Sequence, residues 1–266
     1  MRFLRKLKSW NMKCIYLLIP SIAGTVVFFV IPFVRVIYYS LIDNQFRRNF
    51  VGLDNYVRTF QNEFFQLALL NSLLLLIICI PVLIILAILI SLMLSYGIKT
   101  LRKTRTAFIL PMLIPTASVA EIWRLIFTGD TVLPVYMLFI WKNIGICIIL
   151  LTAALTAIEL EIFEAAKIDG AKGIKLHSRI SVPLILPTII FTVLLSIVNS
   201  FRIFKESYLF YGTNYPPSHS YTLQFYMNNN FLKLDYQALA TSSVYTMILV
   251  IILVLVCFGL QRRYSR

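Results

Sequence analysis

Six long apolar stretches, separated by short polar segments, dominate the chain. The hydrocarbon core of a bilayer is about 30 Å thick and a helix rises about 1.5 Å per residue, so about 20 apolar residues can cross it. The pattern therefore predicts an all-α integral membrane protein with six transmembrane helices. The expected spans are residues 14–39, 66–96, 107–127, 134–158, 184–204 and 237–260.

Prolines interrupt several of these stretches. Pro32 is expected to kink the far half of the first span, because proline removes a helical hydrogen bond. The second span has about 30 residues and would reach roughly 45 Å, longer than the hydrocarbon core. It must tilt, kink at Pro81 or extend past the bilayer. The third span runs through Pro111 and Pro115 and is interpreted as one helix.

The amino-acid composition favours a membrane protein over a soluble domain or a nucleic-acid-binding protein. The chain is 59% hydrophobic and its mean hydropathy is +0.84, more apolar surface than a soluble domain could hide. The net charge of +14 could suggest nucleic acid, but the basic residues form short clusters between apolar stretches and no aromatic-interleaved basic face occurs. We therefore expect no nucleic-acid partner. Neither a CxxC pair nor a Cys/His cluster is present, so we expect no metal site.

The basic clusters set the expected topology, because cytoplasmic loops carry an excess of Lys and Arg. They comprise Arg2, Arg5, Lys6, Lys8 and Lys13 before the first span, Lys99, Arg102, Lys103 and Arg105 after the second, and Arg262, Arg263 and Arg266 after the sixth. Both termini are therefore predicted to be cytoplasmic. The first stretch is too long for the apolar core of a signal peptide and lacks an A-x-A site, so we interpret it as a retained span.

A polar segment between the fourth and fifth spans is rich in helix-forming residues. Acids come first (Glu159, Glu161, Glu164) and bases later (Lys167, Lys172, Lys175, Arg179), the order that a helix dipole favours. Gly170 is expected to end the first helix, and Ile174, His177 and Ile180 share one face of a second. The segment is either a rigid helix–turn–helix that binds a soluble partner or a solvated loop, and these features leave both open.

The identities and spacing in this segment resemble a known motif. Glu164-Ala165-Ala166, Gly170 and Ile180-x-Val182-Pro183 are similar to the EAA motif of ATP-binding-cassette (ABC) importer permeases. Val51-Gly52-Leu53-Asp54-Asn55-Tyr56 and Ile122-Trp123 resemble segments of the sugar-type, or maltose-type, branch. His177 stands where that branch usually has Phe, and the connection at residues 128–133 is shorter than usual.

The resemblance implies one permease subunit of a bacterial inner-membrane importer for a sugar or oligosaccharide. It implies a single permease domain over residues 1–266 and a coupling loop at about residues 159–183. The implied partners are a second homologous permease, two ABC ATPases and an extracellular solute-binding protein. The implied ATPase-coupling residues are Glu164, Ala165, Ala166, Asp169, Gly170, Ala171, Ile180 and Pro183.

Motifs for catalysis are absent from the sequence. It contains no GxxxxGK[ST] phosphate loop, no GxSxG and no HExxH, so we expect neither enzymatic activity nor a cofactor, and we expect energy to come from outside the chain. Glu121 and Arg124, three residues apart, keep an alternative open: an ion-coupled carrier or channel that acts without an ATPase. An ABC importer for a non-sugar solute is a further alternative.

Six polar residues within or beside the spans are candidates for the translocation path. The competing interpretation, which polar residues within spans favour, is that each is an interhelical hydrogen-bonding group that does not touch solute. They are Asn71, Glu121, Asn199, Arg202, Thr241 and Ser242.

Overall fold

The structure is a computed structural model that describes residues 12–96, 107–127 and 131–264. Within these ranges every regular element is helical, and the only strand-like pairing is an isolated bridge between Ile42 and Phe50. The prediction of an all-α protein is confirmed. The basic clusters at residues 2–8 and 99–105, the terminal Arg266 and the first part of the short connection at 128–133 lie outside the described residues.

The chain divides into two compact units. Unit 1 comprises residues 1–61 and 230–245, and unit 2 comprises residues 62–229 and 246–266. Each unit is described by itself below.

Unit 1 begins with an apolar helix that changes its hydrogen-bonding pattern before Pro32. The α-helix α2 (Met12–Thr25) leads into the π-helical turn η1 (Val26–Val30), and α3 (Ile31–Ser40) follows. Pro32 has no N–H to donate to the carbonyl of residue 28, and the Ile31 amide donates to the Val26 carbonyl in the wider π pattern. Where the sequence predicts a kink at Pro32, the structure has a π turn directly before it.

The turn after α3 is tied to α4 (Asp54–Gln61) by a buried amide. The Asn55 side chain donates to the carbonyls of Ser40 at 3.0 Å and Ile42 at 2.8 Å. The hydroxyls of Tyr56 and Ser40 are 2.7 Å apart, and the Tyr56 carbonyl accepts a bond from Tyr245. The short helix α4 is the next helix after the first span, and its Asp-Asn-Tyr residues hold the turn together.

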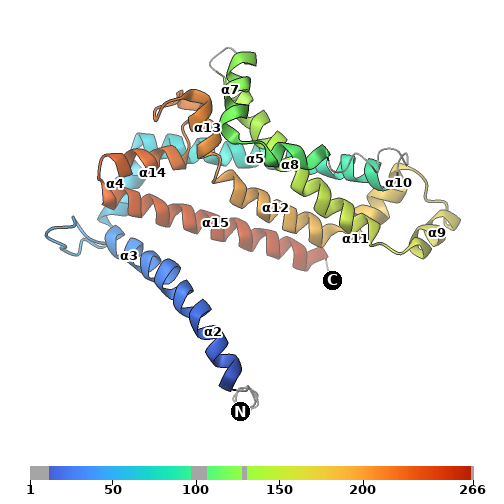
Figure 1. The fold of residues 1–266 in the computed structure, drawn as a ribbon, viewed down its shortest axis with the longest axis horizontal. Helices are drawn as coiled ribbons and strands as arrows, with labels where there is room; N and C mark the ends of the chain where they lie inside the picture. The colour runs from blue at the N-terminus through green and yellow to red at the C-terminus, as the bar shows by residue number, and fades with distance from the viewer. Residues whose placement is uncertain (1–11, 97–106, 128–130, 265–266) are drawn as a thin grey trace. The chain divides into compact units, whose positions relative to one another are not determined.

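Unit 2 is built on two long helices, α5 (Glu63–Tyr96) and α8 (Leu133–Thr156), which lie side by side (Figure 1). At 34 residues, α5 is about 51 Å long, and it continues through Pro81 as one helix. Cys79, Leu83, Ile148 and Leu151 are fully buried members of its core. Apolar side chains on every side of α5 suit a helix that faces protein on one side and lipid on the other.

Two of the six predicted spans are sharply bent. The helices at Ala107–Leu113 and Thr116–Ile126 meet at 100°, and those at Ile174–Leu184 and Leu186–Ser200 meet at 70°. The third span is thus not one straight helix: Pro115 keeps Ile114 in an extended conformation (ψ 132°), which ends the helix before it. By length and composition the described chain has four membrane-crossing helices, or six if each bent pair is one span.

Shorter helices complete unit 2. They are α6 (Leu110–Leu113), α7 (Thr116–Ile126), α9 (Leu160–Ile168), α10 (Ile174–Leu176), the π turn η3 (His177–Ser181), α11 (Val182–Leu184), α12 (Leu186–Ser200), α13 (Phe204–Tyr211) and the 3₁₀ turn η4 (Ser218–Ser220). The last two helices, α14 (Leu223–Leu232) and α15 (Tyr236–Tyr264), contribute residues to both units.

Gly145 is predicted to be essential for the packing of α8 in unit 2. A Cβ built on Gly145 would lie 2.0 Å from the carbonyl oxygen of Phe108, closer than any real contact. We expect Gly145→Ala to destabilise the purified protein by about 1–3 kcal/mol, because one of two backbones must move. Apparent Tm in detergent checks this, with Gly259→Ala as control: Gly259 has nothing within 4 Å of its Cβ position. Equal Tm values for the two variants would contradict the prediction.

Candidate functional site

The polar segment between α8 and α12, residues 159–183, forms a hairpin of helices that we call the docking hairpin. Its first helix, α9, ends in a Schellman motif. The Ala171 amide donates to the Ala166 carbonyl at 2.9 Å, and the Gly170 amide donates to the Lys167 carbonyl at 3.1 Å. Gly170 has a φ of +83°, so the predicted left-handed stop is confirmed. Gly173 supplies a second positive φ, of +56°, that the sequence analysis missed.

A small apolar core holds the two arms of the docking hairpin together. Phe163 and Ala166 from α9 pack with Leu176 from α10, and Ile180 is half-buried against them. Ile174, expected to share a buried face with His177 and Ile180, is 87% exposed, so that part of the prediction is wrong. The three-residue spacing assumed one regular helix, whereas the chain here passes through one short α turn and the π turn η3.

Tyr96, the last residue of α5, connects the docking hairpin to the long helices. Its hydroxyl donates to the carbonyl of Leu155 in α8 at 3.1 Å. Its ring packs against Phe163 of α9, with ring centres 5.1 Å apart, and stacks on His177 at 5.0 Å. The imidazole Nδ1 of His177 lies 3.1 Å from the hydroxyl oxygen of Ser181. One side chain therefore contacts α8 and both arms of the hairpin.

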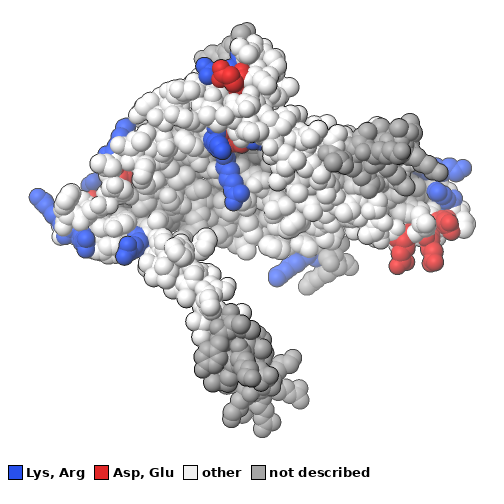
Figure 2. Space-filling model, viewed as in Figure 1, with Lys and Arg blue, Asp and Glu red and all other residues white. Residues whose placement is uncertain are grey.

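The outer surface of the docking hairpin combines acids with exposed apolar side chains. Acidic groups gather at the end of unit 2 that carries α9 (Figure 2). Leu160, Ile168 and Ile174 are each at least 75% exposed nearby. An open groove of about 550 Å³ is lined by Ala165, Asp169, Ile180 and Pro183 among others. An exposed apolar patch rimmed by charge is typical of a protein–protein contact surface.

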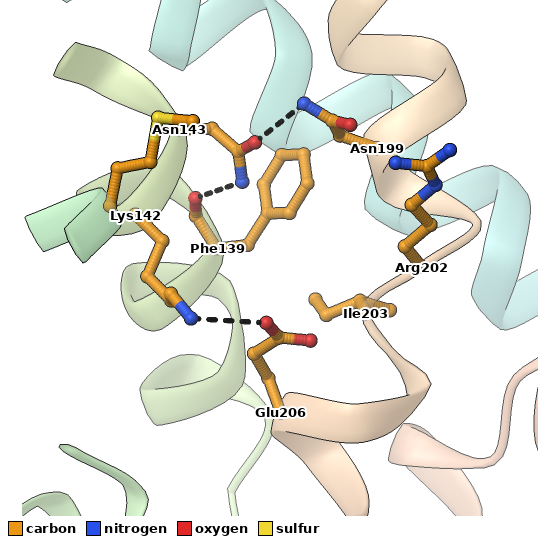
Figure 3. Close-up of a pocket in the computed structure, with 8 residues that line it drawn as sticks. Phe139, Lys142, Asn143, Asn199, Arg202, Ile203 and Glu206 are labelled. Atoms are coloured by element: carbon orange, nitrogen blue, oxygen red, sulfur yellow. Dashed lines mark hydrogen bonds and ion pairs between the residues drawn. The ribbon is translucent and has the colours of Figure 1, made fainter. Parts of the chain in front are cut away.

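A second candidate site is a polar pocket of about 200 Å³ between α8, α12 and α13. Figure 3 shows Lys142 and Asn143 on α8. They face residues of α12, of α13 and of the turn between these two helices. Lys142 forms an ion pair with Glu206 at 3.3 Å, and its ammonium also donates to Thr116 of α7. The Lys142 and Glu206 side chains are 14% and 19% exposed, so the ion pair is mostly buried.

Two amides, one on α8 and one on α12, meet in the polar pocket. The Asn199 side-chain N–H donates to the Asn143 carbonyl oxygen at 2.9 Å, and Asn143 donates to the Phe139 carbonyl at 2.8 Å. Arg202 also lines the pocket, and no partner for its guanidinium is found among the described residues. Of the six path candidates, the structure brings Asn199 and Arg202 together here.

The other four path candidates are engaged elsewhere. Asn71 is buried and donates to the carbonyls of Ser218 and Tyr221, so it fixes the loop before α14. The hydroxyls of Thr241 and Ser242, both fully buried, donate to carbonyls within α15. Glu121 pairs with Arg124 at 3.3 Å, with 66% of its side chain exposed.

Burial raises the pKa of the Tyr221 hydroxyl, which accepts a bond from Asn229 and stays protonated near neutral pH. The loop that Asn71 holds is thus fixed by neutral hydrogen bonds.

The sequence analysis did not select the ion pair in the pocket. Lys142 alone within an apolar stretch was an available signal, because an ionisable residue inside a span needs a partner. Its partner, Glu206, is 64 residues away, and no spacing rule connects them.

A sequence model of the family described as "Binding-protein-dependent transport system inner membrane component" matches residues 62–266. The arabinooligosaccharides transport system permease protein of Bacillus subtilis (strain 168) is 30% identical over 78% of this chain and 75% of its own. The sn-glycerol-3-phosphate transport system permease protein of Yersinia pestis bv. Antiqua (strain Antiqua) is 26% identical over 94% of each chain.

Two solved structures have the same fold. A bacterial ABC transporter involved in the import of the acidic polysaccharide alginate has a TM-score of 0.78 with 22% identity, and each chain is fully covered. The bacterial alginate ABC transporter in complex with alginate pentasaccharide-bound periplasmic protein has a TM-score of 0.76 with 20% identity, covering 100% of this chain and 99% of the other.

The chain therefore belongs to the family of binding-protein-dependent transport system inner membrane components. It is a multi-pass membrane protein and a transport permease subunit of the ABC class, not an enzyme. The resemblance drawn from the EAA-like segment is confirmed at the level of the family.

The ion pair in the polar pocket is predicted to stabilise the protein only while both charges are present. Lys142→Met would leave Glu206 mostly buried without a partner, and Glu206→Met would do the same to Lys142. We expect each single variant to lose about 2–4 kcal/mol and the double variant to recover most of that loss. A double-mutant cycle on thermal unfolding in detergent measures this, and additive losses would contradict it.

Proposed function

We propose that this chain is one permease subunit of a sugar or oligosaccharide importer, driven by separate ATPase subunits that bind the docking hairpin. It acts as a single permease domain in a bacterial plasma membrane, with six spans and both termini in the cytoplasm. A second homologous permease completes the translocation path, two ABC ATPases bind below, and an extracellular solute-binding protein delivers solute.

The observation that carries this proposal is the rigid docking hairpin. Its turn is closed by Gly170 and the Schellman hydrogen bonds, and its own apolar core joins the two arms. A lever that transmits force needs this rigidity. Glu164, Ala165 and Asp169 are exposed along α9 beside the open groove, where a soluble ATPase could bind them.

Tyr96 supplies a path from the docking hairpin to the spans. Movement of α9 would press Phe163 on the Tyr96 ring, and that ring is fixed to the Leu155 carbonyl near the end of α8. Because α5 and α8 share one core, displacement at Tyr96 would move both helices together. Movement driven by ATP would thus reach the polar pocket, which lies along α8.

The sugar class of solute is supported by the relative named for arabinooligosaccharides, whereas the other relative is named for sn-glycerol-3-phosphate, a phosphorylated polyol. The pocket has the chemistry that a polyhydroxyl solute needs, since amides, an ion pair and an apolar wall lie together. A non-sugar solute remains the alternative within the same class of importer.

An ion-coupled carrier is the other alternative, and reconstitution distinguishes the two. We expect the chain in liposomes with its partner permease, but without ATPase subunits, to show no sugar flux under a proton or sodium gradient. Glu121 fits a proton-relay residue poorly because most of its side chain is exposed and paired to Arg124. Gradient-driven flux in this assay would favour the carrier.

Gly170→Glu is predicted to abolish solute uptake while the protein still inserts in the membrane. A residue with a Cβ at φ +83° costs roughly 1–2 kcal/mol, which disturbs the Schellman turn. No atom lies within 4 Å of the Cβ position, so the effect is conformational and not a local clash. Gly170→Asn, which tolerates a left-handed backbone, should retain more uptake and serves as the control. Normal uptake and normal solute-stimulated ATPase activity in Gly170→Glu would overturn the proposal.

Tyr96→Ala is predicted to reduce both the solute-stimulated ATPase activity of the complex and the stability of the protein. Tyr96→Phe keeps both ring contacts and loses only the hydroxyl bond to Leu155, so we expect an intermediate loss. His177→Phe preserves an aromatic stack and should be close to normal. The measurement is ATPase activity of the reconstituted complex with and without solute-loaded binding protein. Equal coupling in the two Tyr96 variants would show that the ring contacts do not matter.

A further inference from the structure

The polar pocket contains an unbalanced positive charge. Lys142 is neutralised by Glu206 at 3.3 Å, and both side chains are mostly buried. Arg202 lines the same pocket as an exposed residue and has no ion-pair or hydrogen-bond partner for its guanidinium among the described residues. In Figure 3 its side chain extends on the Asn199 side, away from Glu206. The described part of the pocket therefore has a net charge of +1.

The pocket also offers groups that suit a sugar ring. The N–H of Asn199 is held by Asn143, which leaves its carbonyl oxygen as an acceptor for a solute hydroxyl. Phe139 and Ile203, each 2% exposed, supply apolar surface for the C–H groups of a ring. At about 200 Å³ the pocket is smaller than the roughly 300–1,000 Å³ of sites for drug-sized ligands, so it suits one ring.

We propose that this pocket binds the carboxylate-bearing ring of an acidic sugar, with Arg202 as the residue that selects the negative charge. The planar guanidinium can donate two parallel hydrogen bonds to a carboxylate, which a hydroxymethyl group cannot accept in the same way. Lys142 contributes little to this selection because Glu206 already holds it. The inference rests on the proposed function and adds the charge of the solute.

Binding to the full-length chain in lipid nanodiscs, together with its partner permease, tests the inference. The probes are methyl β-D-glucuronide and methyl β-D-glucoside, which share a ring and differ in carboxylate against hydroxymethyl. We expect the glucuronide to bind about tenfold more tightly, the worth of one charge-assisted contact. In Arg202→Gln this preference should fall to within about twofold.

Lys205→Gln is the matched control. Lys205, like Arg202, is exposed, but it does not line the pocket. The substitution removes the same charge from the same segment. We expect it to keep the tenfold preference, whereas Arg202→Lys should keep part of it because the charge remains without the planar fork. A preference that survives Arg202→Gln, an equal loss in Lys205→Gln, or no binding of either probe would overturn the inference.

The outcome is separable from that of the proposed function. If uptake depends on Gly170 and the docking hairpin but the pocket ignores charge, the importer assignment stands and the acidic solute is wrong. If the pocket selects the glucuronide through Arg202 but uptake needs no ATPase, the binding site stands and the ATP-driven importer is wrong.

Discussion

The packing of α5 against α8 is the interaction on which the rest of unit 2 depends. Cys79, Leu83, Ile148 and Leu151 are fully buried in the core that the two helices share, and Ser91 adds a hydrogen bond to the Ile148 carbonyl. Both candidate sites are built from this pair. Tyr96 at the end of α5 holds the docking hairpin, and Lys142 and Asn143 on α8 form one wall of the polar pocket. A rigid connection of this kind can transmit movement because packed cores do not deform continuously.

Proline and glycine determine where the helices of this chain change direction. Pro115 produces a 100° bend, whereas α5 continues through Pro81. Ile114, which precedes Pro115, has left the helical conformation, so the helix ends there. In contrast, α5 is held on both sides of Pro81 by its long contact with α8. Gly145 permits close approach of backbones, and Gly170 permits a left-handed turn, so the two glycines serve different needs.

Much of the docking hairpin could be predicted because its determinants are local. The order of acids and bases, the position of Gly170 and the motif spacing all lie within a short stretch of sequence. The buried face of the second arm was predicted wrongly at Ile174, since periodicity assumes one kind of helix and the chain uses a π turn there. The contacts of Tyr96 with Leu155, Phe163 and His177 join residues far apart in sequence, and no local sequence pattern predicts them.

The sequence by itself determined that the chain crosses a membrane through apolar helices, that a polar hairpin interrupts them and that the chain resembles an importer permease. These properties follow from hydropathy, helix length and motif spacing, all of which act over a few turns of helix. Only the tertiary structure decided which polar groups meet. It paired Lys142 with Glu206, engaged Asn71, Thr241 and Ser242 in backbone hydrogen bonds, and left Arg202 in the pocket beside Asn199. The reason is that a polar side chain in an apolar environment takes whichever partner the packing of distant helices brings within reach.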